Sequence, residues 1–265
     1  MKVLPVSTPI NGLRSAAFQV IVGQTRLFFN PGVAAVTKDG DFTIGQARAS
    51  IVEAAGKAHA ILVTDYDASH HNLLQDLPLS AILHLKAPIT PSDWATFRSE
   101  LLPLGGSGQA ISLADGSQFS AGDADIAWSP KNSNSTMVTV RGDGRTLVYA
   151  TQTPTTLTPN SLERIVGEQA DLLYLDITPE AGAEAWSSVQ LTSLAGKLLG
   201  LVATTGSRIL IEGLPLGQPA CRRLFQAPMA TGRVAWAAEY TSQRAARPTT
   251  TIATLSPTEE LALAS

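Results

Sequence analysis

The stretch AILVTDYDASHH at residues 60–71 joins a short apolar run to a cluster of polar side chains. The apolar part, residues 60–64, predicts a strand buried on both faces, because such strands carry continuous aliphatic residues rather than alternating polarity. The polar part begins at Asp65, where this strand ends. Since alternate residues of an extended segment point to the same side, we expect Asp65, Asp67 and Ser69 to face one cleft.

Two interpretations of this polar cluster remain open. In the first, Asp65, Asp67 and His70 hold one Mn, Fe or Mg ion, because oxygen-rich ligand sets suit these ions better than zinc. In the second, Asp65 and Asp67 cap the following turn, while His70 and His71 form a hydrogen-bonded pair at the start of a helix. We favour the second interpretation and expect no bound metal.

The remaining chain alternates between hairpins and strand–helix units. Residues 16–22 and 25–29 are rich in β-formers and flank the turn signal Gly23-Gln24, which predicts a hairpin. Asn30-Pro31-Gly32 ends this hairpin, and helical spacing of apolar residues predicts a helix over 44–58. Similar signals predict a helix that starts after a cap at Thr90. They also predict strands at 110–113, 125–128, 136–140, 146–150, 171–177 and 208–212. Further helices are predicted at 161–169, 186–202 and 219–226. Two similar halves of this kind favour two sheets packed face to face, with helices outside.

The composition favours a single globular domain. The 265 residues are 44% hydrophobic and 15% charged, which allows a sizeable core. We expect one domain over residues 1–243 and a loose tail over 244–265, with a short helix capped near Ser256. The net charge of −3 argues against nucleic acid as a partner. Cys221 is the one cysteine, so the chain has neither an internal disulfide nor a cysteine-based zinc site.

The sequence shows no signal of secretion or of membrane insertion. Proline and asparagine interrupt the N-terminal segment, and the longest apolar runs are shorter than a membrane span. We therefore expect a cytoplasmic protein without a membrane partner.

Five segments, taken in order, resemble the metallo-β-lactamase superfamily. They are residues 26–32, 65–71, 128–133, 143–152 and 208–213. The sequence is similar in particular to uncharacterised, archaeal-type proteins with a double histidine after the main motif. The resemblance implies an α/β fold: a four-layer αββα sandwich of two mixed sheets with outer helices.

The metal-binding motifs of that family are largely replaced here. Asp65 and Asp67 stand where the main motif has two histidines, and Ser69 stands at the motif's aspartate. His70 alone keeps its residue type. Later positions implied by the resemblance are also changed: Asn132 at the third histidine, Gln152 at the bridging aspartate, and Glu212 or Gly213 at the last histidine. The resemblance therefore implies that the standard dinuclear zinc site is lost.

Three functions follow as hypotheses. We favour a non-catalytic relative that binds an unknown small molecule or protein in the old cleft. The alternatives are a hydrolase of esters or phosphoesters with the rebuilt Asp/Asp/His site, in which the ion activates water, and a structural partner in an assembly. The binding protein and the hydrolase would use the same cleft. Its expected residues are Asp65, Asp67, Ser69, His70, His71, Asn132, Gln152 and Glu212. Asp176 ends a predicted strand, and we interpret it as a strand-end cap.

Overall fold

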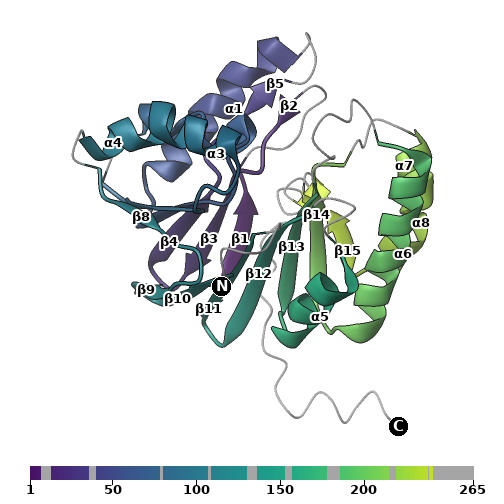
Figure 1. The fold of residues 1–265 in the computed structure, drawn as a ribbon. Helices are drawn as coiled ribbons and strands as arrows, with labels where there is room; N and C mark the ends of the chain where they lie inside the picture. The colour runs from purple at the N-terminus through teal and green to yellow at the C-terminus, as the bar shows by residue number, and fades with distance from the viewer. Residues whose placement is uncertain are drawn as a thin grey trace, which may run out of the picture.

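Two mixed sheets form the centre of the fold in the computed structural model (Figure 1). The structure describes residues 1–6, 13–35, 40–77, 80–106, 109–129, 136–152, 157–177, 186–214, 219–237 and 239–240. The first sheet consists, in spatial order, of β1 (Lys2–Pro5), β3 (Phe18–Val22), β4 (Thr25–Phe29), β6 (Ala60–Val63), β7 (Ile82–Leu85) and β8 (Ile111–Leu113). The second consists of β15 (Val234–Trp236), β14 (Arg208–Glu212), β13 (Leu172–Ile177), β12 (Arg145–Gln152), β11 (Met137–Gly142), β10 (Ala124–Trp128) and β9 (Gln118–Ala121).

Each sheet begins with antiparallel hairpins and continues with parallel strands. In the first sheet, β1, β3 and β4 are antiparallel neighbours, whereas β4, β6, β7 and β8 run parallel. In the second, β9 to β12 are antiparallel and β12 to β15 run parallel. A small pair, β2 (Leu13–Arg14) and β5 (Ala34–Ala35), lies beside the first sheet. The parallel strands of each sheet therefore bring their carboxyl ends to one edge.

Helices cover the outer face of each sheet (Figure 1). On the first sheet these are α1 (Gly40–Ala55), α3 (Pro91–Thr96), the π-helical turn η2 (Phe97–Leu101) and α4 (Leu102–Gly106). The short helix α2 (Ala68–His71) and the 3₁₀ turn η1 (Leu74–Asp76) follow the carboxyl end of β6. On the second sheet the covering helices are α5 (Pro159–Gly167), α6 (Ser188–Thr204), α7 (Pro219–Leu224) and α8 (Gln226–Ala230). This arrangement confirms the predicted αββα sandwich.

The apolar core follows the layers. The described residues form one buried cluster between the first sheet and its helices, one between the sheets, and one between the second sheet and its helices. Strand β6 shows why the run at 60–63 is apolar throughout, since Leu62 faces the second sheet and Ile61 faces the helices. Between the sheets, Phe18 of β3 stacks on Tyr174 of β13 with ring centroids 4.3 Å apart.

Sequence periodicity located the long elements and missed short ones. The helix over 44–58 begins four residues earlier, at Gly40, and ends at Ala55. The predicted cap at Thr90 is confirmed, because its hydroxyl accepts a hydrogen bond from the Asp93 amide. Strands β1, β2, β5, β7, β9 and β15 and helix α8 were not predicted. They have two to five residues each, too few for a period to be read.

Some expectations concern other parts of the chain. The tail over 244–265, with its predicted helix near Ser256, lies outside the described residues. Among the residues described, no helix combines the length and the apolar character needed to cross a membrane.

Hairpin turns from both sheets meet at the edge opposite the parallel strand ends. One of these turns, at Gly142-Asp143-Gly144, joins β11 to β12. One carboxylate oxygen of Asp143 accepts hydrogen bonds from the Gly23 amide, at 3.3 Å, and from the amino group of Met1, at 2.5 Å. A Cβ atom added at Gly142 would lie 2.2 Å from Cγ1 of Val22. The absence of a side chain therefore lets the two sheets approach closely here.

We expect Gly142→Ala to destabilise the fold by about 1–3 kcal/mol, because the added methyl group overlaps Val22 and the backbone of Asp123. Gly196→Ala is the matched control, since Gly196 is an exposed helical residue with no heavy atom within 4 Å of the added Cβ. The control should gain about 0.5–1 kcal/mol. Urea unfolding measures the stability of both variants, and a Gly142→Ala protein that is no less stable than the wild type would contradict the close packing.

His84 makes the stability depend on pH. Its ring, on β7, stacks on Phe119 of β9 with centroids 3.9 Å apart, and burial lowers the pKa of His84 to about 4. Between pH 6.5 and 4 the unfolded chain therefore binds a proton that the folded protein does not, so stability should fall as the pH falls through this window. In His84→Phe, which keeps the stack, urea unfolding at several pH values should show a shallower fall. An unchanged slope would argue against a neutral, buried His84.

Candidate functional site

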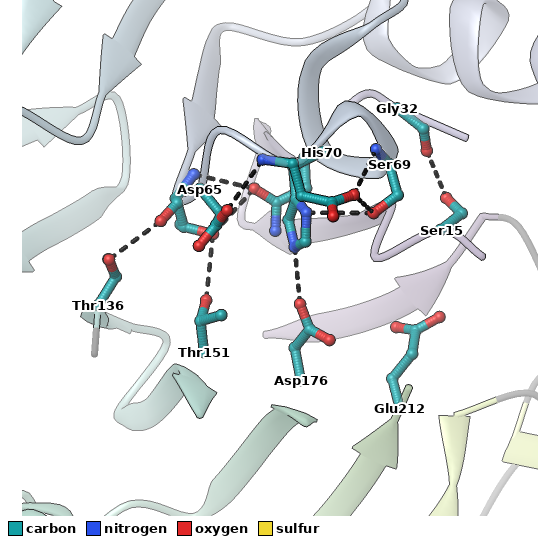
Figure 2. Close-up of polar contacts among 12 residues, drawn as sticks. Ser15, Gly32, Asp65, Ser69, His70, Thr136, Thr151, Asp176 and Glu212 are labelled. Atoms are coloured by element: carbon teal, nitrogen blue, oxygen red, sulfur yellow. Dashed lines mark hydrogen bonds and ion pairs between the residues drawn. The ribbon is translucent and has the colours of Figure 1, made fainter. Parts of the chain in front are cut away.

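Three polar side chains stand in a row at the carboxyl ends of the parallel strands in the second sheet. Thr151 of β12 pairs in register with Asp176 of β13, which pairs with Glu212 of β14. Each lies two residues beyond a side chain of the core between the sheets, and alternate strand residues share a face. The row therefore points toward the first sheet, and Figure 2 shows Thr151, Asp176 and Glu212 side by side beneath it.

The first sheet contributes the turn that follows β6. Asp67 is the N-cap of α2, and its Oδ1 accepts hydrogen bonds from the Ser69 amide at 2.9 Å and the Ser69 hydroxyl at 2.6 Å. Asp65 Oδ1 accepts a hydrogen bond from the Asp67 amide at 2.9 Å. The capping interpretation of the two aspartates is therefore confirmed. Capping also fixes the direction in which α2 presents its next residue, His70.

A glycine holds α2 in position. A Cβ atom added at Gly32 would lie 2.5 Å from the backbone carbon of Ser69 and 2.6 Å from the nitrogen of His70. Only a residue without a side chain allows this approach. The Gly32 carbonyl also accepts a hydrogen bond from the Ser15 hydroxyl at 2.6 Å. The Asn30-Pro31-Gly32 segment, predicted as a strand terminator, thus also acts as a support for α2.

His70 reaches across to the second sheet. Its Nε2 lies 2.8 Å from Oδ2 of Asp176, and both side chains are buried (Figure 2). Its Nδ1 lies 3.3 Å from the Ser69 hydroxyl. Burial lowers the pKa of His70, but the hydrogen bond to Asp176 and the charges of nearby carboxylates outweigh it, so the pKa is raised. The Asp176 carboxylate therefore stabilises the protonated form of the His70 ring.

The hydroxyl of Tyr149 is the centre of the network. It donates to Oδ2 of Asp176 at 3.0 Å and accepts hydrogen bonds from Nδ2 of Asn30 at 2.8 Å and the Thr151 hydroxyl at 3.2 Å. The Asn30 side-chain oxygen accepts from the amide and the hydroxyl of Thr64, both at 3.0 Å. Burial, followed by the Asp176 charge, raises the pKa of Tyr149 well above its ordinary value. The phenol therefore stays neutral and serves as a hydrogen-bonding link.

Glu212 and His71 point to different surroundings. Oε2 of Glu212 accepts a hydrogen bond from the Tyr174 hydroxyl, and burial, followed by the Asp176 charge, raises the pKa of Glu212 well above its ordinary value. His71 bonds through Nδ1 to the Asp67 carbonyl at 2.9 Å and through Nε2 to Glu100 at 3.2 Å. His70 and His71 therefore bond different partners. The prediction that they pair with each other is wrong, because adjacent helical residues point in different directions.

The expected cleft residues are only partly brought together. Asp65, Asp67, Ser69 and His70 cluster around α2, and Glu212 lies on the opposite sheet beside Asp176. Asn132 lies outside the described residues, as does the side chain of Gln152, which ends β12. Asp176, interpreted as a cap, binds His70 and Tyr149 instead. Its partners lie 106 and 27 positions away in the chain, so local sequence patterns gave no signal of the pairing.

The described donor atoms around α2 differ from the ligand set of the dinuclear zinc centre that the resemblance implies for relatives. Within the described part of the chain, no three His, Cys, Asp or Glu side chains are grouped to hold a metal ion. One oxygen of Asp67 caps α2, and Nε2 of His70 faces Asp176. The network adds Asn30, Thr64, Tyr149 and Thr151, whose neutral oxygens and nitrogens bind zinc poorly. The hypothesis of one ion on Asp65, Asp67 and His70 stays a prediction.

The fold is shared with solved structures of the metallo-β-lactamase fold. No family model matches the sequence, and no curated protein is similar to it. YhfI from Bacillus subtilis, a metallo-β-lactamase fold protein, superposes with a TM-score of 0.57 at 14% identity, over 88% of this chain and 95% of that one. Zinc-bound PqqB from Methylobacterium extorquens gives 0.55 at 15% identity, over 89% and 97%. A possible metal-dependent hydrolase from Veillonella parvula gives 0.54 at 10% identity, over 85% and 94%. At these identities the likeness shows the fold alone.

We expect Tyr149→Phe to destabilise the protein by about 2–3 kcal/mol, because it removes the buried hydrogen bonds that the hydroxyl makes with Nδ2 of Asn30 and Oδ2 of Asp176. Tyr66→Phe is the matched control, since its half-buried hydroxyl makes one hydrogen bond, to the Lys86 carbonyl. That variant should lose about 1 kcal/mol. Urea unfolding compares the two, and equal losses would argue against Tyr149 as the centre of the network.

Proposed function

We propose that this protein binds a small molecule or a protein partner at the carboxyl ends of its parallel strands, without a dinuclear zinc centre. The observation that supports this most directly is the contact between His70 and Asp176, 2.8 Å long and buried. In this contact, the one histidine that keeps its type in the metal motif is bonded to a carboxylate of the other sheet. The side chain is thereby committed to joining the sheets.

The surrounding groups favour the same function. Tyr149 and Asn30 complete a network in which donors and acceptors are matched between the sheets. Buried polar networks of this kind fix one arrangement of their members. A site built in this way is preorganised for recognition, because its side chains do not need to be ordered when a ligand binds.

A metal-dependent hydrolase is the second candidate. The observation that favours it is the position of Asp65 and Asp67, which lie in the turn just before His70 and have partly exposed side chains. A single Mn, Fe or Mg ion at these residues would supply Lewis-acid activation of water for ester or phosphoester hydrolysis. In that case His70 would have to exchange Asp176 for the ion.

Metal content distinguishes the two candidates. After dialysis against a chelator and then against buffer with Mn, Fe and Mg, we expect the protein to retain far less than one ion per chain. Elemental analysis by mass spectrometry measures this. The expected result has a physical reason, since the described donors do not form a three-residue ligand group.

The matched comparison is an Asp65→Ala, Asp67→Ala variant beside Asp125→Ala, which removes an exposed carboxylate of β10. All three proteins should hold the same trace of metal. About one ion per chain in the wild type and in Asp125→Ala, lost in the double variant, would overturn the proposal and favour the hydrolase.

A further inference from the structure

Glu212 is the one member of the strand-end row without a described partner across the sheets. Thr151 lies 3.4 Å from the Thr64 hydroxyl, and Asp176 lies 2.8 Å from His70. Glu212 is 4% exposed and bonds Tyr174 of its own sheet through Oε2. Its other oxygen, Oε1, is buried and has no hydrogen-bond partner among the described residues. Oε1 of Glu212 is therefore a buried acceptor, at the end of the row, that no described donor uses.

An unused acceptor of this kind calls for a ligand. A buried polar atom without a partner costs about 1–3 kcal/mol, and nearly all such atoms in folded proteins are bonded. Figure 2 shows Glu212 pointing from the end of β14 toward the side of Ser15 and Gly32, where the Ser15 hydroxyl is already used by the Gly32 carbonyl. The position is also one where sheets with parallel strands commonly bind ligands, beyond their carboxyl ends.

The charges around Glu212 select the chemistry of that ligand. Neighbouring strands lie about 4.8 Å apart, so the carboxyl groups of Asp176 and Glu212 are close. His70 balances Asp176, whereas no described cationic side chain forms an ion pair with Glu212. An anionic ligand would be repelled by Asp176. Burial and the Asp176 charge raise the pKa of Glu212, so the ionised carboxylate is destabilised in the ligand-free protein. A cationic donor bonded to Oε1 would stabilise that ionised form.

We propose that Glu212, supported by Asp176, forms a recognition subsite for the primary ammonium group of a small ligand. A primary ammonium is compact and carries three N–H donors, which suits a buried carboxyl oxygen that lies beside a second carboxyl group. The planar guanidinium group is larger and demands a forked geometry, which one free oxygen does not provide. This subsite rests on the proposed ligand-binding function and specifies the ligand class.

The first experiment observes Glu212 directly in the unmodified protein. The chelator-treated wild type, labelled with ¹³C at its glutamate carboxyl groups, is titrated with n-propylammonium chloride. We expect a saturable change in the Glu212 carboxyl resonance, which is assigned by its absence from Glu212→Gln. n-Propanol and sodium chloride serve as controls for the alkyl group and the salt, and neither should produce the change.

The second experiment measures affinity through variants. We expect Glu212→Gln to bind n-propylammonium at least about tenfold more weakly than the wild type in thermal-shift titrations, because it removes a charge-assisted hydrogen bond. Glu168→Gln, which changes a carboxylate paired with Arg141 at the surface, is the matched control and should bind like the wild type.

The outcomes separate this subsite from the proposed function. The metal content of each titrated sample is measured, and a retained ion counts against the proposed function whatever the titration shows. A Glu212 resonance that does not move saturably, or that moves equally with n-propanol, overturns the subsite in any sample. The subsite is supported by a saturable change of the Glu212 resonance that only n-propylammonium causes, together with thermal-shift binding that weakens in Glu212→Gln and not in Glu168→Gln.

Discussion

The bond between His70 and Asp176 is the constraint on which the rest of the site depends. It joins the turn after β6 to the end of β13 through two buried side chains. A buried carboxylate is costly without a partner, so His70 must stay in place. The Asp67 cap and the close approach of Gly32 to α2 are the local means by which the chain keeps it there. The Asp67 cap and Gly32 thus both keep His70 in position to contact Asp176.

The two edges of the sandwich are held together by different physics. At the turn edge, small residues let the sheets approach, and Asp143 receives amide and amino groups from the first sheet. At the strand-end edge, a network of neutral and charged side chains centred on Tyr149 joins the sheets. The aromatic core with Phe18 and Tyr174 lies between them. Of these two edges, the strand-end edge carries the residues of the proposed ligand site.

Much of the fold could be predicted from the sequence, because apolar runs and helical spacing are local signals. The run at 60–64 and the cap at Thr90 were of this kind, as was the capping role of Asp67. The site was less accessible. The ring of Tyr149 packs in the core between the sheets, so its sequence context resembles that of any core residue. Its hydroxyl alone takes part in the polar network. Asp176 contacts His70 because the two sheets pack face to face, and no local sequence pattern predicts that contact.

The chain distances within the network also bear on how the protein folds. Asn30 meets Tyr149 across 119 positions, and His70 meets Asp176 across 106. Contacts of such long range pay a large loop-closure entropy and form after more local pairings. The strand-end edge is therefore expected to assemble late, once both halves of the chain have built their sheets. Newly synthesised chains would pass through a stage in which both sheets exist and His70, Asp176 and Glu212 are still open to water.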